Sequence, residues 1–172
     1  MDLQFRNAGI NDTNAVCVLV NSVYRGENSK KGWTTEAYML DGIRIDIPGI
    51  RKIIGKKDNV IILAMFEDLI IGCAHLEHKI NKCHLGMLSV DVNFQDKGIG
   101  KKIMQYSEEY AKSEWKCKIM EMKVIAQRKE LIDFYIRRGY KITGESEPFL
   151  LNAHFGEPKT SDLYFEYLTK EL

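Results

Sequence analysis

The sequence predicts a mixed α/β (α+β) protein in which a central sheet carries helices on both faces. Amphipathic helical stretches and β-rich runs alternate along the whole chain. Three β-rich runs follow one another between residues 60 and 92, which is typical of a meander. The chain then continues as helix, strand, helix, strand and strand. A sheet covered on both faces buries the apolar sides of all these elements.

The N-terminal third is expected to form one strand followed by helices. Residues 3–6 (LQFR) predict a short strand, and Asn11 and Asp12 can cap the helix that follows. That helix places apolar residues on one stripe: Val16, Leu19, Val20 and Val23. Residues 33–40 (WTTEAYML) predict a second short helix. Pro48 stops any helix from running through it, and residues 49–54 (GIRKII) predict one or two further helical turns.

The remaining elements follow from changes of period. Residues 60–66 and 69–78 predict a hairpin around Glu67 and Asp68, and residues 84–92 a third strand. Residues 99–114 predict a helix with one apolar face: Ile99, Ile103, Tyr106 and Tyr110. Residues 119–125 alternate as a strand with one covered face. Residues 129–138 predict a helix that Gly139 ends in a left-handed conformation, and residues 140–145 and 161–169 predict the closing strands.

Size and composition favour one ordinary globular domain over residues 1–172, with 45% hydrophobic and 28% charged residues. The net charge of +1 argues against a general nucleic-acid binder. No apolar run reaches the roughly 20 residues that span a bilayer, and the N-terminus lacks a signal-peptide layout, so we expect a cytoplasmic protein without membrane partners. The cysteines show no ligand spacing, so we expect reduced thiols and no metal: Cys17, Cys73, Cys83 and Cys117.

Gly98 and Gly100 stand where a strand gives way to a helix, in the stretch VNFQDKGIGKKIMQY. A helix N-terminus exposes unpaired N–H groups and partial positive charge, which together favour an anion such as phosphate. Glycine lets the preceding loop curl closely around that anion. Neither the P-loop pattern nor the dinucleotide fingerprint is present, because Ile103 stands where a third glycine would be needed.

The stretch QDKGIG after a strand resembles the Q/R-x-x-G-x-G/A motif of the GNAT acetyltransferase superfamily. The segment ELIDFYIRRGYKITGE resembles the family's second characteristic stretch, and the element order is similar over almost the full length. The stretch YRGE…GWTTEAYMLDGIR resembles one poorly characterised branch of the superfamily. This resemblance implies a GNAT fold, with a mixed, mostly antiparallel sheet of six to seven strands.

The resemblance also implies that acetyl-coenzyme A is the acyl donor and that no metal is needed. Its diphosphate would be bound by the loop and helix start: Gln95, Asp96, Lys97, Gly98, Ile99, Gly100 and Lys101. Its pantetheine arm would pair with the splayed strand at Leu88, Ser89 and Val90. Arg128 stands where many relatives carry Asn, and it could contact phosphate or pantetheine instead.

The implied reaction is acetyl transfer to an amine. Tyr135 aligns with the family's tyrosine, which faces the cofactor sulfur, and would supply a proton to the departing thiolate. The backbone near Val90 would stabilise the oxyanion. Candidate bases are Glu36 and Glu77, with Asp91 and the histidines His75, His78 and His84 as weaker alternatives; proton removal through ordered water remains an alternative to any single base.

The acceptor pocket is expected between residues 24–40 and 147–159, with aromatic residues available to line it: Tyr24, Trp33, Phe149 and Phe155. Any of them could equally belong to the core. The leading interpretation is an N-acetyltransferase acting on a primary amine of a small molecule, such as an amino acid or an antibiotic-like compound. The alternatives are a protein or peptide N-acetyltransferase and a non-catalytic acyl-coenzyme A sensor. The chain is expected to be a monomer or a homodimer.

Overall fold

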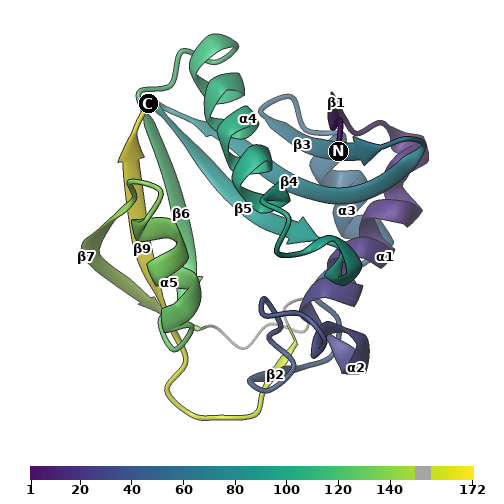
Figure 1. Cartoon of the computed structure of the whole chain (residues 1–172). Coiled ribbons are helices and arrows are strands. Elements are labelled where there is room, and N and C mark those ends of the chain that lie inside the picture. The colour runs from purple at the N-terminus through teal and green to yellow at the C-terminus, as the bar shows by residue number, and fades with distance from the viewer. Residues whose placement is uncertain (150–155) are drawn as a thin grey trace.

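The computed structural model describes residues 1–149 and 156–172. Its strands and helices, drawn in Figure 1, are β1 (Gln4–Asn7), α1 (Thr13–Tyr24), α2 (Gly26–Ser29), β2 (Leu40–Asp41), α3 (Ile47–Ile54), β3 (Asn59–Phe66), β4 (Leu69–Lys79), β5 (Lys82–Val90), α4 (Ile99–Ser113), β6 (Ile119–Ile125), α5 (Lys129–Ile136), β7 (Lys141–Pro148), β8 (Glu157–Pro158) and β9 (Tyr164–Glu171). Short 3-10 helices precede α1 (Ile10–Asp12) and α4 (Val92–Phe94).

Among the described residues, the central sheet has seven strands in the order β1-β3-β4-β5-β6-β9-β7. β5 and β6 pair in parallel, and the other neighbouring strands of this sheet pair antiparallel. The parallel ladder joins only residues 82–84 of β5 to residues 119–121 of β6. Beyond His84 the two strands diverge, as Figure 1 shows. The sheet therefore opens at the C-terminal ends of β5 and β6.

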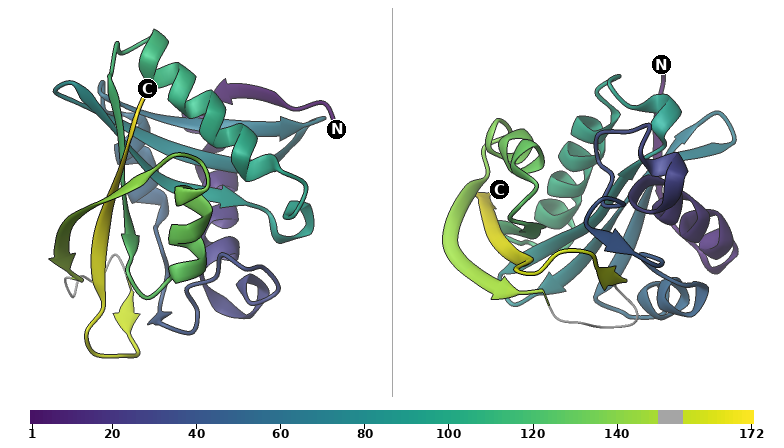
Figure 2. Two further views of the ribbon diagram at one scale, coloured as in Figure 1. Left: turned by 60° about the vertical axis from the view of Figure 1, so that its left-hand side comes forward. Right: turned by 90° about the horizontal axis from the view of Figure 1, so that it is seen from below.

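Helices cover both faces of the sheet, as predicted (Figure 2). On one face, α4 and α5 pack onto the sheet through a core that includes Ile103 and Met104. On the other face, α1 and α3 pack through Val20, Val23 and Ile50. The predicted fold class and the mostly antiparallel sheet are confirmed. The stripe predicted for α1 is buried along its whole length.

Residues 33–40 form turns and not the predicted second helix. The nearby helix is α2, over residues 26–29. Backbone groups of this segment form hydrogen bonds with residues outside it. Thr34 O accepts from Arg128 at 2.6 Å, and Glu36 N donates to Tyr24 O at 3.0 Å. These contacts outweigh a weak local helix preference. The segment ends in β2, which pairs with β8 in a small second sheet that the sequence did not predict.

Two predicted details of the helices are also wrong. The Asp12 side chain does not cap α1; it pairs with Arg6 at 2.7 Å and accepts from Gly9 N. In α4, Ile99 and Ile103 are buried as predicted, but the buried stripe continues through Met104, Ser107 and Ala111. Tyr106 lies at its edge and stacks on Phe5, with 4.6 Å between ring centroids.

None of the helices within residues 1–149 and 156–172 is long and apolar enough to cross a membrane. The four cysteines carry free thiols, and Cys73, Cys83 and Cys117 are buried.

Candidate functional site

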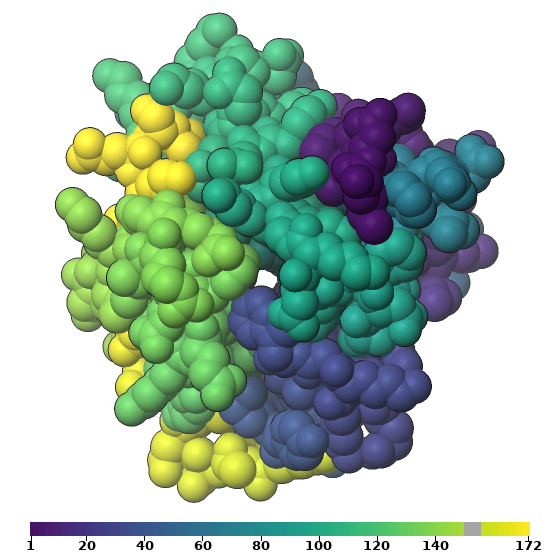
Figure 3. Space-filling model, viewed as in Figure 1, coloured from purple at the N-terminus to yellow at the C-terminus, as the bar shows by residue number. Residues whose placement is uncertain are grey.

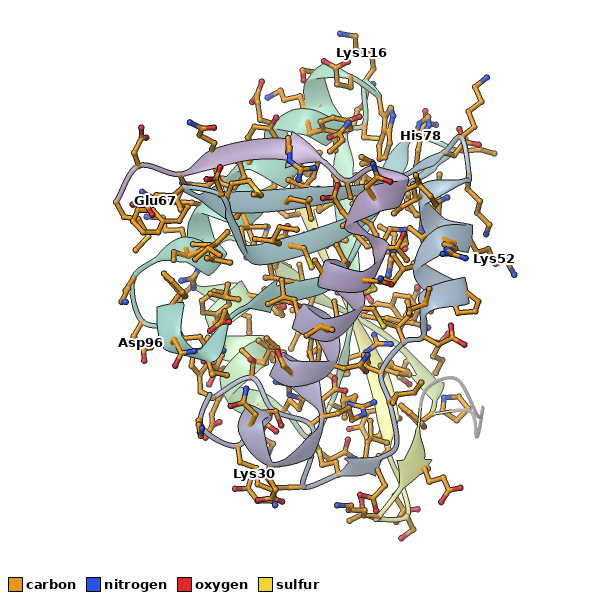
Figure 4. The ribbon with its side chains drawn as sticks, turned by 90° about the vertical axis from the view of Figure 1, so that its right-hand side faces the viewer. Lys30, Lys52, Glu67, His78, Asp96 and Lys116 are labelled. Carbon is orange, nitrogen blue, oxygen red and sulfur yellow. The ribbon has the colours of Figure 1, made fainter. Side chains whose placement is uncertain are left out.

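The bend before α4 has the conformation that a main-chain anion cradle requires. Asp96 and Gly98 both adopt left-handed conformations, with φ of 60° and 73°. Figure 4 shows Asp96 at the outer edge of this bend. In the described part of the chain, the N–H groups of residues 95–101 have no hydrogen-bond acceptor, and no side chain caps α4. Successive free N–H groups at the start of a 15-residue helix form a site for a negatively charged group.

A cavity of about 670 Å³ adjoins this bend. Figure 3 shows a hollow where α5, the start of α4 and the segment around α2 meet. The cavity is lined from the bend and α4 by Gln95, Asp96, Gly98, Ile99, Gly100 and Lys101, from β5 by Leu88 and Val90, and from elsewhere by Tyr24, Trp33, Thr34, Glu130, Leu131, Phe134, Tyr135, Arg137 and Arg138. Loop, strand edge and helix start thus share one opening.

The Gln95 side chain ties the bend to the neighbouring segments. Its Oε1 accepts from Trp33 N at 3.2 Å, and its Nε2 donates to Thr34 Oγ1 at 3.2 Å and to Val90 O at 3.1 Å. The end of β5, the bend and the segment around Trp33 are therefore held together. Because these hydrogen bonds occupy its side chain, Gln95 holds the bend in place and does not offer its side-chain amide to a ligand.

β5 changes direction beside the cavity. Met87 has φ of 49°, and the register between β4 and β5 shifts between Cys73 and His75. Such a bulge bends a strand and re-aims its side chains. The Tyr24 hydroxyl donates to Leu88 O at 2.7 Å, so α1 fixes β5 one residue after the bulge. Burial raises the pKa of the Tyr24 phenol to about 12, so it stays a donor.

Basic side chains line the larger cavity from the start of α4 and from the end of α5. The basic lining residues are Lys101, Arg137 and Arg138, and Asp96 and Glu130 are the acidic lining residues among residues 1–149 and 156–172. The Arg138 guanidinium lies over the Phe134 ring, 3.2 Å from its centroid, and donates to Phe134 O at 2.6 Å. The Phe134 ring also contacts Trp33, with 5.2 Å between centroids. These contacts place positive charge near the α4 N-terminus, where it adds to the helix dipole.

A second cavity, of about 200 Å³, lies between the diverging strands. Its lining is partly apolar and includes Leu40, Leu85, Met87, Met122, Val124, Ile125, Pro148, Phe149 and Phe165. Besides tyrosines, its described ionisable lining residues are Arg25, Glu36, Arg44, His84, Lys123, Arg128 and Glu147. Tyr24, Leu88, Leu131 and Tyr135 line both cavities. A ligand in one cavity can therefore approach a ligand in the other at these four residues.

Tyr135 lies at that junction and is 6% exposed. Its ring contacts Phe134 and Tyr140 edge-on. Burial, followed by the nearby Tyr24 phenol, raises the pKa of Tyr135 well above its usual value. The hydroxyl therefore keeps its proton through the neutral range and can donate a hydrogen bond.

Glu36 is buried among arginines at the smaller cavity. Arg25 Nη1 pairs with Glu36 Oε2, and Arg128 Nη1 lies 3.3 Å from Glu36 Oε1. Burial raises the pKa of the Glu36 carboxyl, but the charges of Arg44, Arg128 and Arg25 outweigh it, and the net pKa is lowered. A carboxylate with a lowered pKa is a weak base. Arg128 lines this cavity and not the larger one beside the bend.

Other predicted residues lie away from the two cavities. Ser89 is fully buried and its hydroxyl donates to Met87 O; Lys97 extends to Asn93 O. Glu77 lies on β4 beside Lys79, with 3.7 Å between the charged atoms. The Asp91 carboxylate caps the 3-10 helix by accepting from Asn93 N.

The weaker histidine and aromatic candidates are also separated. His75 bonds to Asn59, and His78 stacks on Trp115, whereas His84 lines the smaller cavity. Trp33 lines the larger cavity, Phe149 the smaller one, and Tyr24 both. Phe155 lies outside the described residues.

Sequence reasoning missed most of the arginines at the two cavities. Arg137 and Arg138 could have been found, because two consecutive arginines precede the glycine that ends α5. Arg25 and Arg44 give no such signal, since they are isolated in the sequence. Across residues 1–149 and 156–172, no three His, Cys, Asp or Glu side chains are grouped to hold a metal ion.

Comparison with known proteins places these features in context. Residues 21–140 match the model of the acetyltransferase (GNAT) family. No curated protein matches the chain by sequence. Many solved structures are similar in fold, and three of them are described here. An N-acetyltransferase from Staphylococcus aureus Mu50 is 17% identical over 99% of this chain and 98% of its own, with a TM-score of 0.75.

The other two have named substrates of different kinds. The ribosomal-protein-S18-alanine N-acetyltransferase of Escherichia coli is 9% identical over 99% of this chain and 94% of its own, with a TM-score of 0.73. A spermidine/spermine N-acetyltransferase of Vibrio cholerae, solved in mutant forms, is 12% identical over 99% of this chain and 95% of its own, with a TM-score of 0.68. Because these sequence identities are low, the similarity shows a shared fold and not a shared substrate.

Proposed function

Because the chain belongs to the acetyltransferase (GNAT) family, whose members transfer acetyl groups from acetyl-coenzyme A, we propose that it acetylates a primary amine of a small molecule. One observation carries this proposal: a cavity at an anion cradle and a smaller cavity share a wall that contains Tyr135. Such an arrangement suits two substrates that must meet at one reacting centre.

The residues of the larger cavity fit acetyl-coenzyme A. Free N–H groups at residues 95–101, together with Lys101, Arg137 and Arg138, suit a diphosphate. At Leu88 and Val90, β5 no longer pairs with β6, so its backbone edge is available. Such an edge suits the amide groups of a pantetheine arm. Ser89 and Lys97 contribute through the backbone, because their side chains are engaged elsewhere.

Acetyl-coenzyme A supplies the acetyl group as a thioester. The overall change forms an N–C bond, breaks the C–S bond and moves one proton from the amine to the sulfur. Tyr135 keeps its proton and donates a hydrogen bond to the departing sulfur. Because its pKa is raised, stabilisation of the thiolate by this hydrogen bond is favoured over complete proton transfer. The sulfur then takes its proton from water, which also receives the proton that the amine loses.

We propose that the amine loses its proton through water and not directly to a carboxylate. Glu36 is held by two arginines and has a lowered pKa, which suits a role in positioning these arginines. Glu77 does not line either cavity. His84 does line the smaller cavity, where burial lowers its pKa to about 4, so its imidazole is neutral but weakly basic.

The dimensions of the smaller cavity favour a small acceptor. A volume of about 200 Å³ between β5, β6 and the segment around Glu36 suits a single small molecule. A peptide acceptor, the first alternative, needs an open groove. A non-catalytic acyl-coenzyme A sensor, the second, has no use for a second cavity that meets the first at a tyrosine.

The test is release of free thiol from acetyl-coenzyme A in the presence of purified protein and a panel of amines. Turnover with small amines supports the proposal, whereas turnover with peptides alone identifies a peptide acetyltransferase. If no acceptor is used while calorimetry still detects coenzyme A binding, the protein is a sensor. If coenzyme A does not bind, the cradle has been assigned wrongly.

A further inference from the structure

His84 lies on the wall of the smaller cavity, and one nitrogen of its ring faces a carboxylate. The imidazole is largely buried, and its Nδ1 lies 3.8 Å from Glu121 Oε1. Within residues 1–149 and 156–172, neither Nδ1 nor Nε2 of His84 forms a hydrogen bond. A buried polar group without a hydrogen bond costs free energy, and in native proteins such a group commonly meets water or a ligand.

The other edge of the ring lies beside Gly86. His84 and Gly86 are two positions apart on β5 and therefore face the same side of the sheet. A methyl group on Gly86 would lie 3.9 Å from Cδ2 and 3.9 Å from Nε2 of His84. Gly86 also lines the smaller cavity. The Nε2 edge of His84 is thus turned toward the cavity, whereas Nδ1 faces Glu121.

This orientation makes Nε2 a hydrogen-bond acceptor. Burial lowers the pKa of His84 to about 4, so the imidazole is neutral at pH 7. A neutral imidazole carries its proton on one of the two nitrogens. The Glu121 carboxylate favours the proton on Nδ1, which leaves the lone pair on Nε2. A ligand group that meets His84 in the cavity must therefore donate a hydrogen bond.

The charges around His84 favour a neutral donor. Each carboxylate that interacts electrostatically with this histidine pairs with a lysine: Glu77 with Lys79, Glu121 with Lys82, and Glu147 with Lys123. An ammonium group bound at His84 would have to compete with these lysines, and a carboxylate would face the carboxylates themselves. A hydroxyl group donates a hydrogen bond without either cost.

The strand β5 sets the length of the ligand. Leu88, in the wall that both cavities share, lies four positions after His84. An extended strand rises about 3.3 Å per residue, so these positions are separated by about 13 Å or less. With a hydrogen-bond length of about 3 Å left at His84, a molecule of roughly 9 Å fits between them. The lining includes apolar residues: Leu85, Met87, Met122 and Val124.

We propose, building on the function proposed above, that the acceptor is a small primary amine with an apolar middle and a hydroxyl group at its opposite end, and that His84 binds this hydroxyl through Nε2. The amine then lies at the shared wall beside Leu88 and Tyr135. His84 is thus a specificity-determining residue and not the base.

The experiment compares acceptors that differ in one terminal group. Thiol release from acetyl-coenzyme A is measured with aminohexanol and heptylamine, in which a methyl group replaces the hydroxyl. Ethanolamine and propylamine form a second pair that is too short to reach His84 from the shared wall. We expect kcat/KM for aminohexanol to exceed that for heptylamine by roughly 3- to 10-fold, the range for one hydrogen bond between neutral groups. The short pair should differ little.

His84→Leu removes the acceptor nitrogen. The preference for aminohexanol should fall to near unity, mainly through KM of aminohexanol, while KM for acetyl-coenzyme A stays unchanged. His84→Gln should keep part of the preference, because its amide oxygen can accept in place of Nε2. His78→Leu is the matched control, since His78 stacks on Trp115 outside both cavities, and it should keep the full preference. Circular dichroism checks that the variants are folded.

Gly86→Ala tests the path of the acceptor without touching His84. The fold accommodates the added methyl group, because the nearest protein atoms would lie 3.9 Å away, at an ordinary contact distance. The same methyl group takes space beside Nε2. KM for aminohexanol should rise by roughly 10-fold, at the low end for one group added to a packed space. KM for propylamine should stay unchanged.

The outcomes separate this inference from the proposed function. Turnover of heptylamine at or above the rate of aminohexanol, an unchanged preference in His84→Leu, or an unchanged KM in Gly86→Ala would overturn the inference and leave the acetyltransferase intact. If no amine is acetylated, calorimetry with aminohexanol and coenzyme A decides. Binding of aminohexanol that His84→Leu abolishes supports the hydroxyl site alone, and absence of binding overturns both.

Discussion

The phenol of Tyr24 donates a 2.7 Å hydrogen bond to the carbonyl oxygen of Leu88, across 64 positions of sequence. This bond joins the last residue of α1 to β5, directly after the bulge at Met87. Both residues line both cavities. The position of the strand edge that we assign to the pantetheine arm thus depends on a helix from the opposite face of the sheet.

Tyr24→Phe removes this hydrogen bond and leaves the ring in place. We expect the free energy of unfolding to fall by about 1 kcal/mol, the typical net value of one hydrogen bond. Urea denaturation measures this change. Tyr38→Phe is the control, because Tyr38 is 67% exposed and its loss should cost much less. Equal stability of the two variants would show that the bond contributes nothing.

Tyr135→Phe tests the hydrogen-bond donor at the junction of the cavities. The variant keeps the buried ring and loses the hydroxyl, so turnover should fall by roughly 100-fold, at the low end for loss of a hydrogen-bond donor that stabilises developing negative charge. Calorimetry should give an unchanged Kd for coenzyme A. Tyr106→Phe, at the partly exposed edge of α4, serves as the control. An unchanged rate in Tyr135→Phe would reject this role.

Glu77→Gln should leave kcat/KM within about twofold of the wild type, well below the loss of 100-fold or more that follows removal of a general base. The reason is position: Glu77 lies beside Lys79 on β4 and does not line either cavity. Steady-state thiol release measures the effect. A drop of that larger size would instead restore Glu77 as the base and argue against proton loss through water.

The parts of the fold that the sequence predicted are those with strong local patterns. The α1 stripe repeats with helical spacing, and the β3–β4 hairpin turns at Glu67, which adopts a left-handed conformation, with φ of 51°. The helix predicted for residues 33–40 was wrong, because the structure of this segment depends on contacts such as the hydrogen bond from Arg128 to Thr34, 94 positions away. A propensity cannot anticipate a hydrogen bond that only the finished fold brings within reach.

The same division applies to the candidate site. The bend at residues 95–101 could be proposed from sequence, because its glycines and the helix start are contiguous. The arginines of the smaller cavity could not, since Arg25, Arg44 and Arg128 are brought together only when α2, the loop before α3 and the start of α5 assemble. The sequence identified Glu36 as a candidate base. It could not show that the pKa of Glu36 is lowered, because that shift depends on the charges of these distant arginines.

Stability should depend on pH through His75. Burial, together with the charge of His84, lowers the pKa of His75 to about 4, whereas an unfolded histidine has a pKa near 6.5. The unfolded state therefore binds the proton first, and the free energy of unfolding falls as the pH drops from about 6.5 to about 4. Carboxyl groups with lowered pKa, such as Asp12, act below this window.

Urea denaturation at pH 7, 5.5 and 4.5 measures this dependence. His75→Asn loses the hydrogen bond to Asn59 at every pH, so the slope and not the absolute stability is the relevant quantity. We expect a shallower slope in the variant, by up to about 3 kcal/mol over the window. An identical slope would show that His75 titrates normally in the folded protein.

Gly98→Ala tests the cradle on which the proposed function depends. Gly98 has φ of 73°, and a methyl group there would meet no protein atom within 4 Å, so the cost comes from the backbone conformation alone. Gly144→Ala is the matched control. Gly144, on β7, has φ of 85° and equally open space around it, but it lies outside both cavities. Each alanine variant should lose about 1–2 kcal/mol of stability.

The two variants should differ in coenzyme A binding. In Gly98→Ala the bend relaxes from the left-handed conformation and its N–H groups no longer converge, so the Kd should rise by about tenfold, which corresponds to 1.4 kcal/mol. In Gly144→Ala the Kd should stay unchanged. Isothermal titration calorimetry measures both values. Equal affinities in two variants that are equally destabilised would show that the bend does not hold the diphosphate.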